Sequence, residues 1–237
     1  MSIFDFIFGN RISTTSFNQL RSKIVKLRKS NIYPFVENLP QAISFPYDFW
    51  KDIIKIFKST DSDGRERAFS IFWADGEVLF TKVKTGSDRM VKSGGSVQIK
   101  YSQHPTKRDY ARKELYIDGK LEKKRDVYFK NVPKSLEVQY LFNIHTHPKY
   151  IREDGTNNYH FFSAQDIKSL ISSKAIMTGL ITDVVWILIR TSKTPDNVDT
   201  LVDSQVTPEY LEEVLHIGLY KAKFNEKAFR YRYVKDI

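Results

Sequence analysis

One short apolar run, Ile181–Arg190, constrains the fold more than any other feature of the chain. Its segment VVWILIR is rich in β-branched residues, and it falls far short of the ~20 apolar residues needed to cross a bilayer. A run of this kind is typical of a strand buried on both faces. The sequence therefore predicts a sheet with this strand in its interior.

Other segments alternate between helical and strand periodicity. Helices are expected after the cap residue Ser16, with Phe17, Leu20, Ile24 and Leu27 on one face, then at Tyr47–Lys58, at Ser163–Lys174, and from Thr207-Pro208 onward with Leu211, Val214 and Leu215 inward. Two hairpins are expected, one of Glu66–Trp73 and Val78–Val83 around the turn Asp75-Gly76, and one of Glu114–Ile117 and Lys124–Lys130 around the turn Asp118-Gly119. Further strands are expected at Val97–Tyr101 and Val138–His145. Because the two kinds of element are mixed without strict alternation, the predicted class is α/β (α+β), with a mixed sheet flanked by helices.

The chain of 237 residues divides, on these patterns, into two parts. Residues 1–43 form a basic helical N-terminal extension. Residues 44–237 form the main domain, with polar inserts at 85–112 and 149–162 and a helix near the C-terminus. Residues 31–46, broken by three prolines, form the crossing between the two parts.

Charge and cysteine content limit the classes of function. The formal net charge is +10, and Lys82–Lys134 alone holds 15 Lys/Arg against 6 Asp/Glu. Such a balance favours an acidic partner, whether nucleic acid, an anionic membrane or an acidic protein, and does not choose among them. The absence of cysteine excludes a disulfide scaffold, a thiolate zinc site, an iron–sulfur cluster and a cysteine nucleophile. With no membrane span or export signal visible, we expect a soluble cytoplasmic protein.

The chemistry is concentrated in two short segments, NIHTHP at Asn143–Pro148 and SAQD at Ser163–Asp166. Residues two apart on a strand point the same way, so His145 and His147 can present both imidazoles to one point. A carboxylate on the first turn of the next helix, Asp166, can complete a three-ligand site that suits Zn²⁺ and leaves a position for water. Taken alone, Ser163 and Asp166 also read as a helix capping box.

This order of strand, His-x-His-Pro, loop, Ser-x-x-Asp, helix and buried strand resembles the JAMM (MPN-domain) zinc metalloprotease family. The resemblance covers about Ser44–Arg190 and implies an MPN-like fold and one zinc ion per chain. It implies an isopeptidase or peptidase acting on a protein substrate, such as a conjugate of a ubiquitin-like protein. The family also contains members that have lost catalysis.

By the same resemblance, His145, His147 and Asp166 are the zinc ligands and Ser163 stabilises the oxyanion. Glu66, at the start of the strand after the first helix of the domain, becomes the general base that takes a proton from the zinc-activated water. Glu77, on the partner strand, is the other candidate. The chain departs from the family pattern in the long segment of 15 residues between His147 and Ser163, which is expected to be an extruded loop.

Further departures are Ala68, where the family often has glycine, and Asn143-Ile144 before the first histidine. His160, inside the long segment, is expected to be a solvated loop residue.

Two alternatives remain open. The first is a catalytically inactive MPN-like scaffold that binds a partner protein in a larger complex. The second is a nucleic-acid-binding protein, because Tyr101, Tyr110, Tyr116, Tyr128 and Phe129 are interleaved with Lys and Arg. Against the second, hairpin aromatics are expected to face a core while the cations face water.

Overall fold

A mixed ten-stranded sheet forms the body of the protein in the computed structural model, which describes residues 14–74, 77–132, 138–173 and 175–231. Its strands follow the spatial order β1-β2-β15-β14-β13-β12-β9-β3-β4, and β5 pairs with β3. They are β1 (Thr14–Ser16), β2 (Ala42–Ser44), β3 (Arg67–Ala74), β4 (Glu77–Phe80), β5 (Lys84–Thr85), β9 (Val138–Thr146), β12 (Met177–Ile181), β13 (Val185–Ile189), β14 (Gly218–Ala222) and β15 (Ala228–Arg230). The predicted mixed α/β class with a mixed sheet is confirmed.

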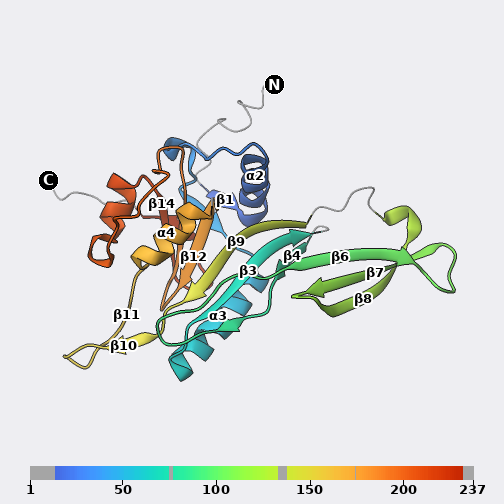
Figure 1. Cartoon of the computed structure of the whole chain (residues 1–237), viewed down its shortest axis with the longest axis horizontal. Coiled ribbons are helices and arrows are strands. Elements are labelled where there is room, and N and C mark those ends of the chain that lie inside the picture. The colour runs from blue at the N-terminus through green and yellow to red at the C-terminus, as the bar shows by residue number, and fades with distance from the viewer. Residues whose placement is uncertain (1–13, 75–76, 133–137, 174, 232–237) are drawn as a thin grey trace.

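Helices cover both faces of this sheet (Figure 1). Helices α2 (Phe17–Lys29) and α3 (Tyr47–Asp63) pack on one face, and α4 (Ala164–Ser172) packs on the other. Ile187 and Leu188, neighbours on β13, are fully buried in the two different hydrophobic clusters. The strand expected to be buried on both faces therefore exists, because successive side chains of a strand point to opposite faces.

The boundaries of that strand differ from the prediction of Ile181–Arg190. β13 starts only at Val185, and Ile181 is the last residue of β12, which pairs with β13 as an antiparallel hairpin. The polar turn between them interrupts the apolar run, since the Thr182 hydroxyl donates to the Val184 carbonyl at 3.0 Å. The segment predicted as a single strand thus contains the last residue of β12, the turn and the whole of β13.

The described part of the N-terminal segment belongs to the main domain. β1 pairs in parallel with β2, and Phe17 of α2 is buried with its ring 5.3 Å from that of Phe45. Ser16 caps α2 as predicted, because its hydroxyl accepts from the Gln19 N–H while its own N–H donates to the Gln19 side chain. Residues 14–43 therefore pack into the same core as the rest of the domain, and residues 1–13 of the expected extension lie outside the described part.

The helix and hairpin that follow agree with the sequence pattern, with one change. α3 runs to Asp63 rather than Lys58, and it ends where Gly64 adopts a left-handed conformation with φ 68°. β3 and β4 form the expected antiparallel hairpin. Its predicted turn, Asp75-Gly76, lies outside the described residues.

A separate antiparallel sheet of three strands projects from the body, and we call it the arm (Figure 1). It consists of β6 (Val97–Gln103), β7 (Tyr110–Ile117) and β8 (Lys120–Tyr128), followed by the 3₁₀ turn η2 (Phe129–Asn131). The hairpin predicted around Asp118-Gly119 is present, and both turn residues have positive φ, 51° and 75°, as a two-residue hairpin turn requires. The polar region expected as an insert at 85–112 is therefore part of a larger unit that continues to the end of β8.

The remaining connections differ more from the prediction. The long segment at 149–162, expected to be an extruded loop, contains a short hairpin of β10 (Lys149–Ile151) and β11 (Asn157–Tyr159). The C-terminal helix is a single π-helical turn, η4 (Tyr210–Val214), which buries Leu211 and Leu215 but leaves Val214 53% exposed. Two strands that the sequence did not indicate, β14 and β15, follow it and link β13 to β2. Two further 3₁₀ turns are η1 (Val36–Asn38) and η3 (Asp203–Gln205).

No helix in the described part of the chain combines the length and the apolar content needed to cross a membrane.

Candidate metal centre

His145 and His147 lie at the end of β9, in the interior of the sheet. β9 is hydrogen-bonded to β3 on one side and to β12 on the other, and the His147 N–H donates to the Ile181 carbonyl at 3.1 Å. The side chain of Thr146, between them, takes the opposite face and shares a hydrogen bond of 2.8 Å with Thr60 of α3. The alternation of the strand thus places both imidazoles on one face, as the spacing predicted.

Asp166 reaches this face from the first turn of α4. Ser163 is the N-cap residue of the helix, and its N–H and hydroxyl both donate to Oδ2 of Asp166 at 2.8 Å. The Asp166 N–H donates in return to the Ser163 hydroxyl at 3.2 Å. The predicted capping box is therefore present, and it uses Oδ2, while Oδ1 lies 3.3 Å from Nε2 of His145.

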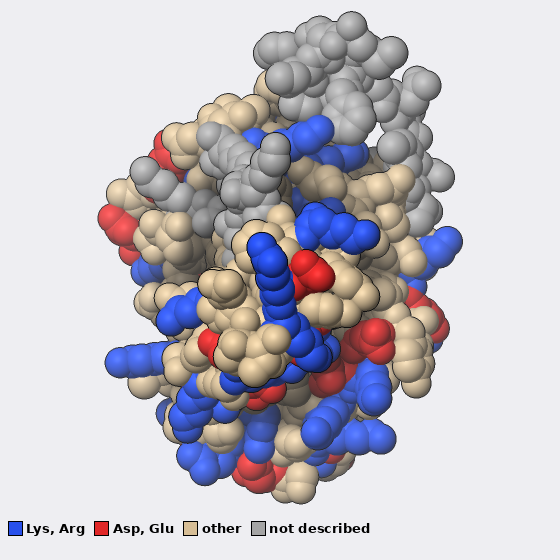
Figure 2. All heavy atoms as spheres, turned by 90° about the vertical axis from the view of Figure 1, so that its right-hand side faces the viewer, with Lys and Arg blue, Asp and Glu red and all other residues tan. Residues whose placement is uncertain are grey.

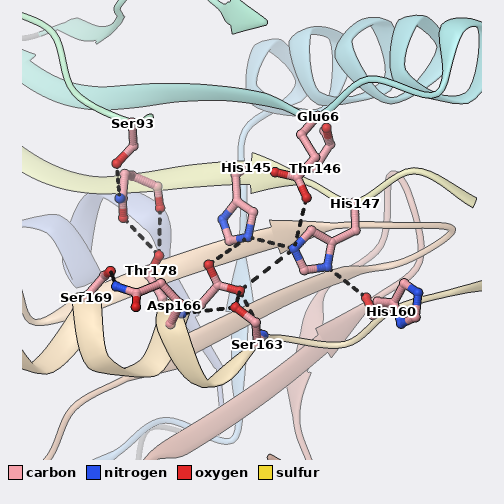
Figure 3. A network of polar contacts seen from close by, with 12 residues as sticks. Glu66, Ser93, His145, Thr146, His147, His160, Ser163, Asp166, Ser169 and Thr178 are labelled. Carbon is pink, nitrogen blue, oxygen red and sulfur yellow. Dashed lines mark hydrogen bonds and ion pairs between the residues drawn. The ribbon is translucent and has the colours of Figure 1, made fainter. Parts of the chain in front are cut away.

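Three donor atoms converge at this point (Figure 3). The two Nε2 atoms of His145 and His147 are 3.2 Å apart, and Nε2 of His147 lies 3.8 Å from Oδ2 of Asp166. Ligands about 2.0–2.2 Å from a tetrahedral Zn²⁺ stand about 3.3–3.5 Å from one another. The two imidazole nitrogens, 3.2 Å apart, and Oδ1 of Asp166, 3.3 Å from Nε2 of His145, have this spacing, whereas the 3.8 Å contact of Asp166 with His147 is made by its other oxygen, Oδ2. The donor set is therefore suited to a zinc ion with a fourth position open.

His160 contributes to the centre through its backbone rather than its ring. Its carbonyl accepts a hydrogen bond of 3.0 Å from Nδ1 of His147, which keeps Nε2 of His147 free to act as a ligand. The His160 ring instead stacks on Tyr150 of β10, with centroids 4.2 Å apart. A carbonyl carries no residue-type signal, so the sequence could not have indicated this contact.

The electrostatics of the cluster favour the protonation states that metal ligands need at His147 and at Asp166. Burial, followed by the neighbouring His145, lowers the pKa of His147 to about 4. At His145 burial also acts to lower the pKa, but Asp166 and then Glu66 outweigh it and raise the pKa above its usual value, so a metal would have to displace a proton there. Burial alone would raise the pKa of Asp166, but His145 and then His147 hold it below its usual range. Asp166 is therefore an anion and His147 a neutral imidazole near neutral pH.

Glu66 lies beside the same cluster, just before β3. Its side chain is only 6% exposed, and Oε1 is 3.8 Å from Nε2 of His147. Burial raises the pKa of Glu66 to about 7, an effect that His145 partly offsets and Asp166 reinforces. The backbone of Glu66 is fixed, since its N–H donates to the Ser87 carbonyl at 2.7 Å.

Glu77, the other candidate for this role, lies elsewhere. It starts β4 and pairs with Ala74, at the end of β3 that is far from Glu66. The structure thus brings together Glu66, His145, His147, Ser163 and Asp166 around one cavity, whereas the strand register places the backbone of Glu77 at the other end of β3.

That cavity has a volume of about 460 Å³. The segment 88–93 borders it on one side and α4 on the other, and the cluster lies between them. Asn143 ties the segment 88–93 to β12, because its Nδ2 donates to the Ser93 hydroxyl at 2.8 Å and its Oδ1 accepts from the Thr178 hydroxyl at 2.9 Å (Figure 3). In the sequence, Asn143 stands out only as a departure from the family pattern, and its residue type did not predict this contact.

Comparison with known proteins gives no independent assignment: no protein-family model, no curated protein and no solved structure matches the chain. The residues of the cluster and their geometry must therefore carry the argument.

Proposed function

We propose that this chain is a zinc-dependent amide hydrolase of the JAMM/MPN type, which cleaves a peptide or isopeptide bond in a protein substrate. One observation carries the proposal: two imidazoles and a carboxylate converge within 4.8 Å of one another, and Glu66 and Ser163 line the same cavity. Among the described residues, no other group of His, Asp and Glu side chains converges in this way.

The residues present fit the metal. His145, His147 and Asp166 would hold it, since one ligand atom of each lies within 4.8 Å of the others and the two imidazole nitrogens are 3.2 Å apart. A zinc ion at this position supplies a Lewis acid and lowers the pKa of a coordinated water toward ~7.

Glu66 and Ser163 then have separate tasks. The Glu66 carboxylate, 3.8 Å from a ligand atom of His147, takes the proton of the attacking water as the new C–O bond forms. The same carboxyl group passes that proton to the amine as the C–N bond breaks, so an amide and a water give an acid and an amine. The Ser163 hydroxyl, held by Asp166 at 2.8 Å, turns toward the carbonyl oxygen and donates to it while it bears negative charge.

The lining of the cavity is compatible with a polypeptide as the substrate. Residues of the segment 88–93 and of α4 line it, and polar groups from Asn143, Thr178 and His160 are among them. A conjugate of a ubiquitin-like protein offers an amide bond at the end of an extended tail, and such a tail is the substrate that we propose.

The first test is the metal content of the untagged protein purified without chelator. We expect about one zinc per chain, and we expect it to be lost in Asp166→Ala. Absence of metal from the wild-type protein, even after zinc is supplied, would rule out the proposed function.

The second test compares Glu66→Gln with Glu77→Gln in hydrolysis of fluorogenic peptide and isopeptide substrates. Glu66→Gln is expected to keep the zinc and lose hydrolysis, because the amide cannot accept the proton. Glu77→Gln is the matched control, since Glu77 lies at the other end of the hairpin, and it is expected to keep both. Full activity in Glu66→Gln would contradict the assigned role.

A further inference from the structure

The arm presents one of its two faces away from the body of the protein. By register, the residues of this outer face are Gln98, Lys100, Ser102, Tyr110, Arg112, Glu114, Tyr116, Leu121, Lys124, Asp126 and Tyr128. The opposite face is turned to the body, because Ile99, Leu115 and Lys113 line a small cavity together with Leu79 of β4. The outer face is therefore the one that a partner can reach.

Two of the five aromatic residues are exposed on or beside this face, contrary to the expectation that hairpin aromatics face a core, whereas Tyr101 lies by register on the face turned to the body. Tyr128 is 49% exposed and Phe129, the next residue, is 59% exposed. The rings of Tyr110 and Tyr128 lie side by side across β7 and β8, with centroids 4.3 Å apart and planes inclined by 32°. Tyr116 lies on the same face six residues along β7, about 20 Å away at ~3.4 Å per residue.

Lysines flank these rings. Lys107 stands 5.3 Å from the centroid of Tyr110, Lys130 stands 5.7 Å from that of Tyr128, and Lys100 stands 4.8 Å from that of Tyr116. A solvent-exposed cation–π contact is weak, so an ammonium group can exchange its ring for a phosphate, and Lys107 must in addition leave its ion pair with Asp126 at 3.0 Å.

The charge of the arm is strongly positive. Residues 97–130 contain 10 Lys and Arg against 5 Asp and Glu. Four of the acids are already engaged: Asp126 contacts Lys107 and His104, and Glu114 accepts from the Tyr116 hydroxyl. Asp118 accepts from two backbone N–H groups, and Glu122 pairs with Lys82. On the end of the molecule at which the arm projects, Lys and Arg side chains are scattered among uncharged residues and are more prominent than Asp and Glu (Figure 2).

We propose that the outer face of the arm binds single-stranded nucleic acid, with bases stacked on Tyr110, Tyr128 and Tyr116 and phosphates paired with the flanking lysines. Tyr128 is exposed and Tyr110 and Tyr116 are half-buried on one face of a small sheet, an arrangement on which unpaired bases can stack while neighbouring cations neutralise the backbone. An acidic protein would use the cations but not the rings. This inference does not rest on the proposed hydrolase activity, and the two can fail independently.

The test is the binding of a fluorescein-labelled oligothymidylate of ~20 nucleotides, followed by anisotropy at salt concentrations from about 50 to 300 mM. We expect Tyr110→Ala and Tyr128→Ala each to weaken binding by about tenfold, with little change in the dependence on salt, because each removes a stacking platform worth ~1–3 kcal/mol per base. The Phe variants at the same positions keep the ring and are expected to keep the affinity.

The lysines have a different expected effect. Lys107→Gln and Lys130→Gln are each expected to reduce the slope of log K against log salt by ~0.7, the value for one phosphate contact on a single strand. The matched controls are Tyr47→Ala and Lys51→Gln on α3, where Tyr47 is 76% exposed. Both controls should bind like the wild-type protein, and thermal melts of every variant verify folding.

Absence of binding at about 50 mM salt would overturn the proposal. The proposal would also be overturned if the tyrosine variants bound the oligonucleotide like the wild-type protein and heparin competed for binding as well as an unlabelled oligonucleotide. That result would show a surface that attracts any polyanion without contacting bases.

Discussion

Thr146, between the two histidines, links the candidate site to the rest of the fold through one buried hydroxyl. Its Oγ1 accepts a hydrogen bond of 2.8 Å from the Arg67 N–H and shares another of 2.8 Å with the hydroxyl of Thr60. Thr146 and Thr60 are both fully buried. Since Arg67 follows Glu66, this hydroxyl fixes the start of β3 and with it the position of the Glu66 carboxylate.

Thr146→Val tests this link because valine keeps the shape and replaces the hydroxyl by a methyl group. The Arg67 N–H loses its acceptor, and a buried polar group left without a partner costs about 1–3 kcal/mol. The added methyl group recovers part of this through apolar burial. We expect a net destabilisation of about 2 kcal/mol, which corresponds to a fall in Tm of about 4–8 °C for a chain of this size.

The assay is urea unfolding followed by circular dichroism, with the midpoint expected to fall while the slope m stays constant. Thr146→Ser is the matched control, because it keeps the hydroxyl and loses only a methyl group. Zinc content should be unchanged in both variants, since this side chain points to the opposite face from the imidazoles. A valine variant within about 0.5 kcal/mol of the wild-type protein, or a serine variant equally destabilised, would refute the reasoning.

Three further outcomes are expected. Asn143→Ala should speed hydrogen exchange in the segment 88–93 while zinc is retained, because the contact of Asn143 with Ser93 is lost. Asp166→Asn should lose zinc but keep the helical circular dichroism signal, since the amide oxygen can still accept at the N-cap while the anionic ligand is gone. Tyr220→Phe should lower the free energy of unfolding by about 1–2 kcal/mol in urea, because the buried Tyr220 hydroxyl donates to the Pro40 carbonyl at 2.8 Å.

Local rules explain why the sequence indicated the cluster. The period of two in a strand aligns His145 and His147, and the capping geometry of Ser163 and Asp166 fixes the first turn of a helix. Both are short-range constraints, so residue spacing is enough to place the side chains relative to their own elements. Only the distance between the strand and the helix could not be predicted from the sequence. In the structure, Nε2 of His145 lies 3.3 Å from Oδ1 of Asp166.

The contacts that the sequence could not indicate are of two kinds. Some use the backbone, as the His160 carbonyl does toward His147, and a carbonyl is present at every residue. Others join segments far apart in the chain, as Asn143 joins Ser93, 50 residues away. Neither kind leaves a pattern of residue types at a fixed spacing.

The C-terminal part of the fold was missed for a related reason. β14 and β15 have five and three residues, too short for the alternation of a strand to stand out, and their place in the sheet depends on pairing with β13 and β2. In the same region a helical pattern around Leu211 extended over a single turn only. Tertiary pairing thus decided the structure where local preference was weak.

Asp166 shows why a structural and a functional interpretation of one residue need not compete. A carboxylate has two oxygens, and here Oδ2 accepts both hydrogen bonds from Ser163, while Oδ1 faces His145. The capping box orients the carboxylate before any metal arrives, and two donors on Oδ2 reduce the freedom that the side chain would lose on binding. The same residue can therefore cap a helix and ligate a metal, and the capping hydrogen bonds favour ligation because they orient the carboxylate in advance.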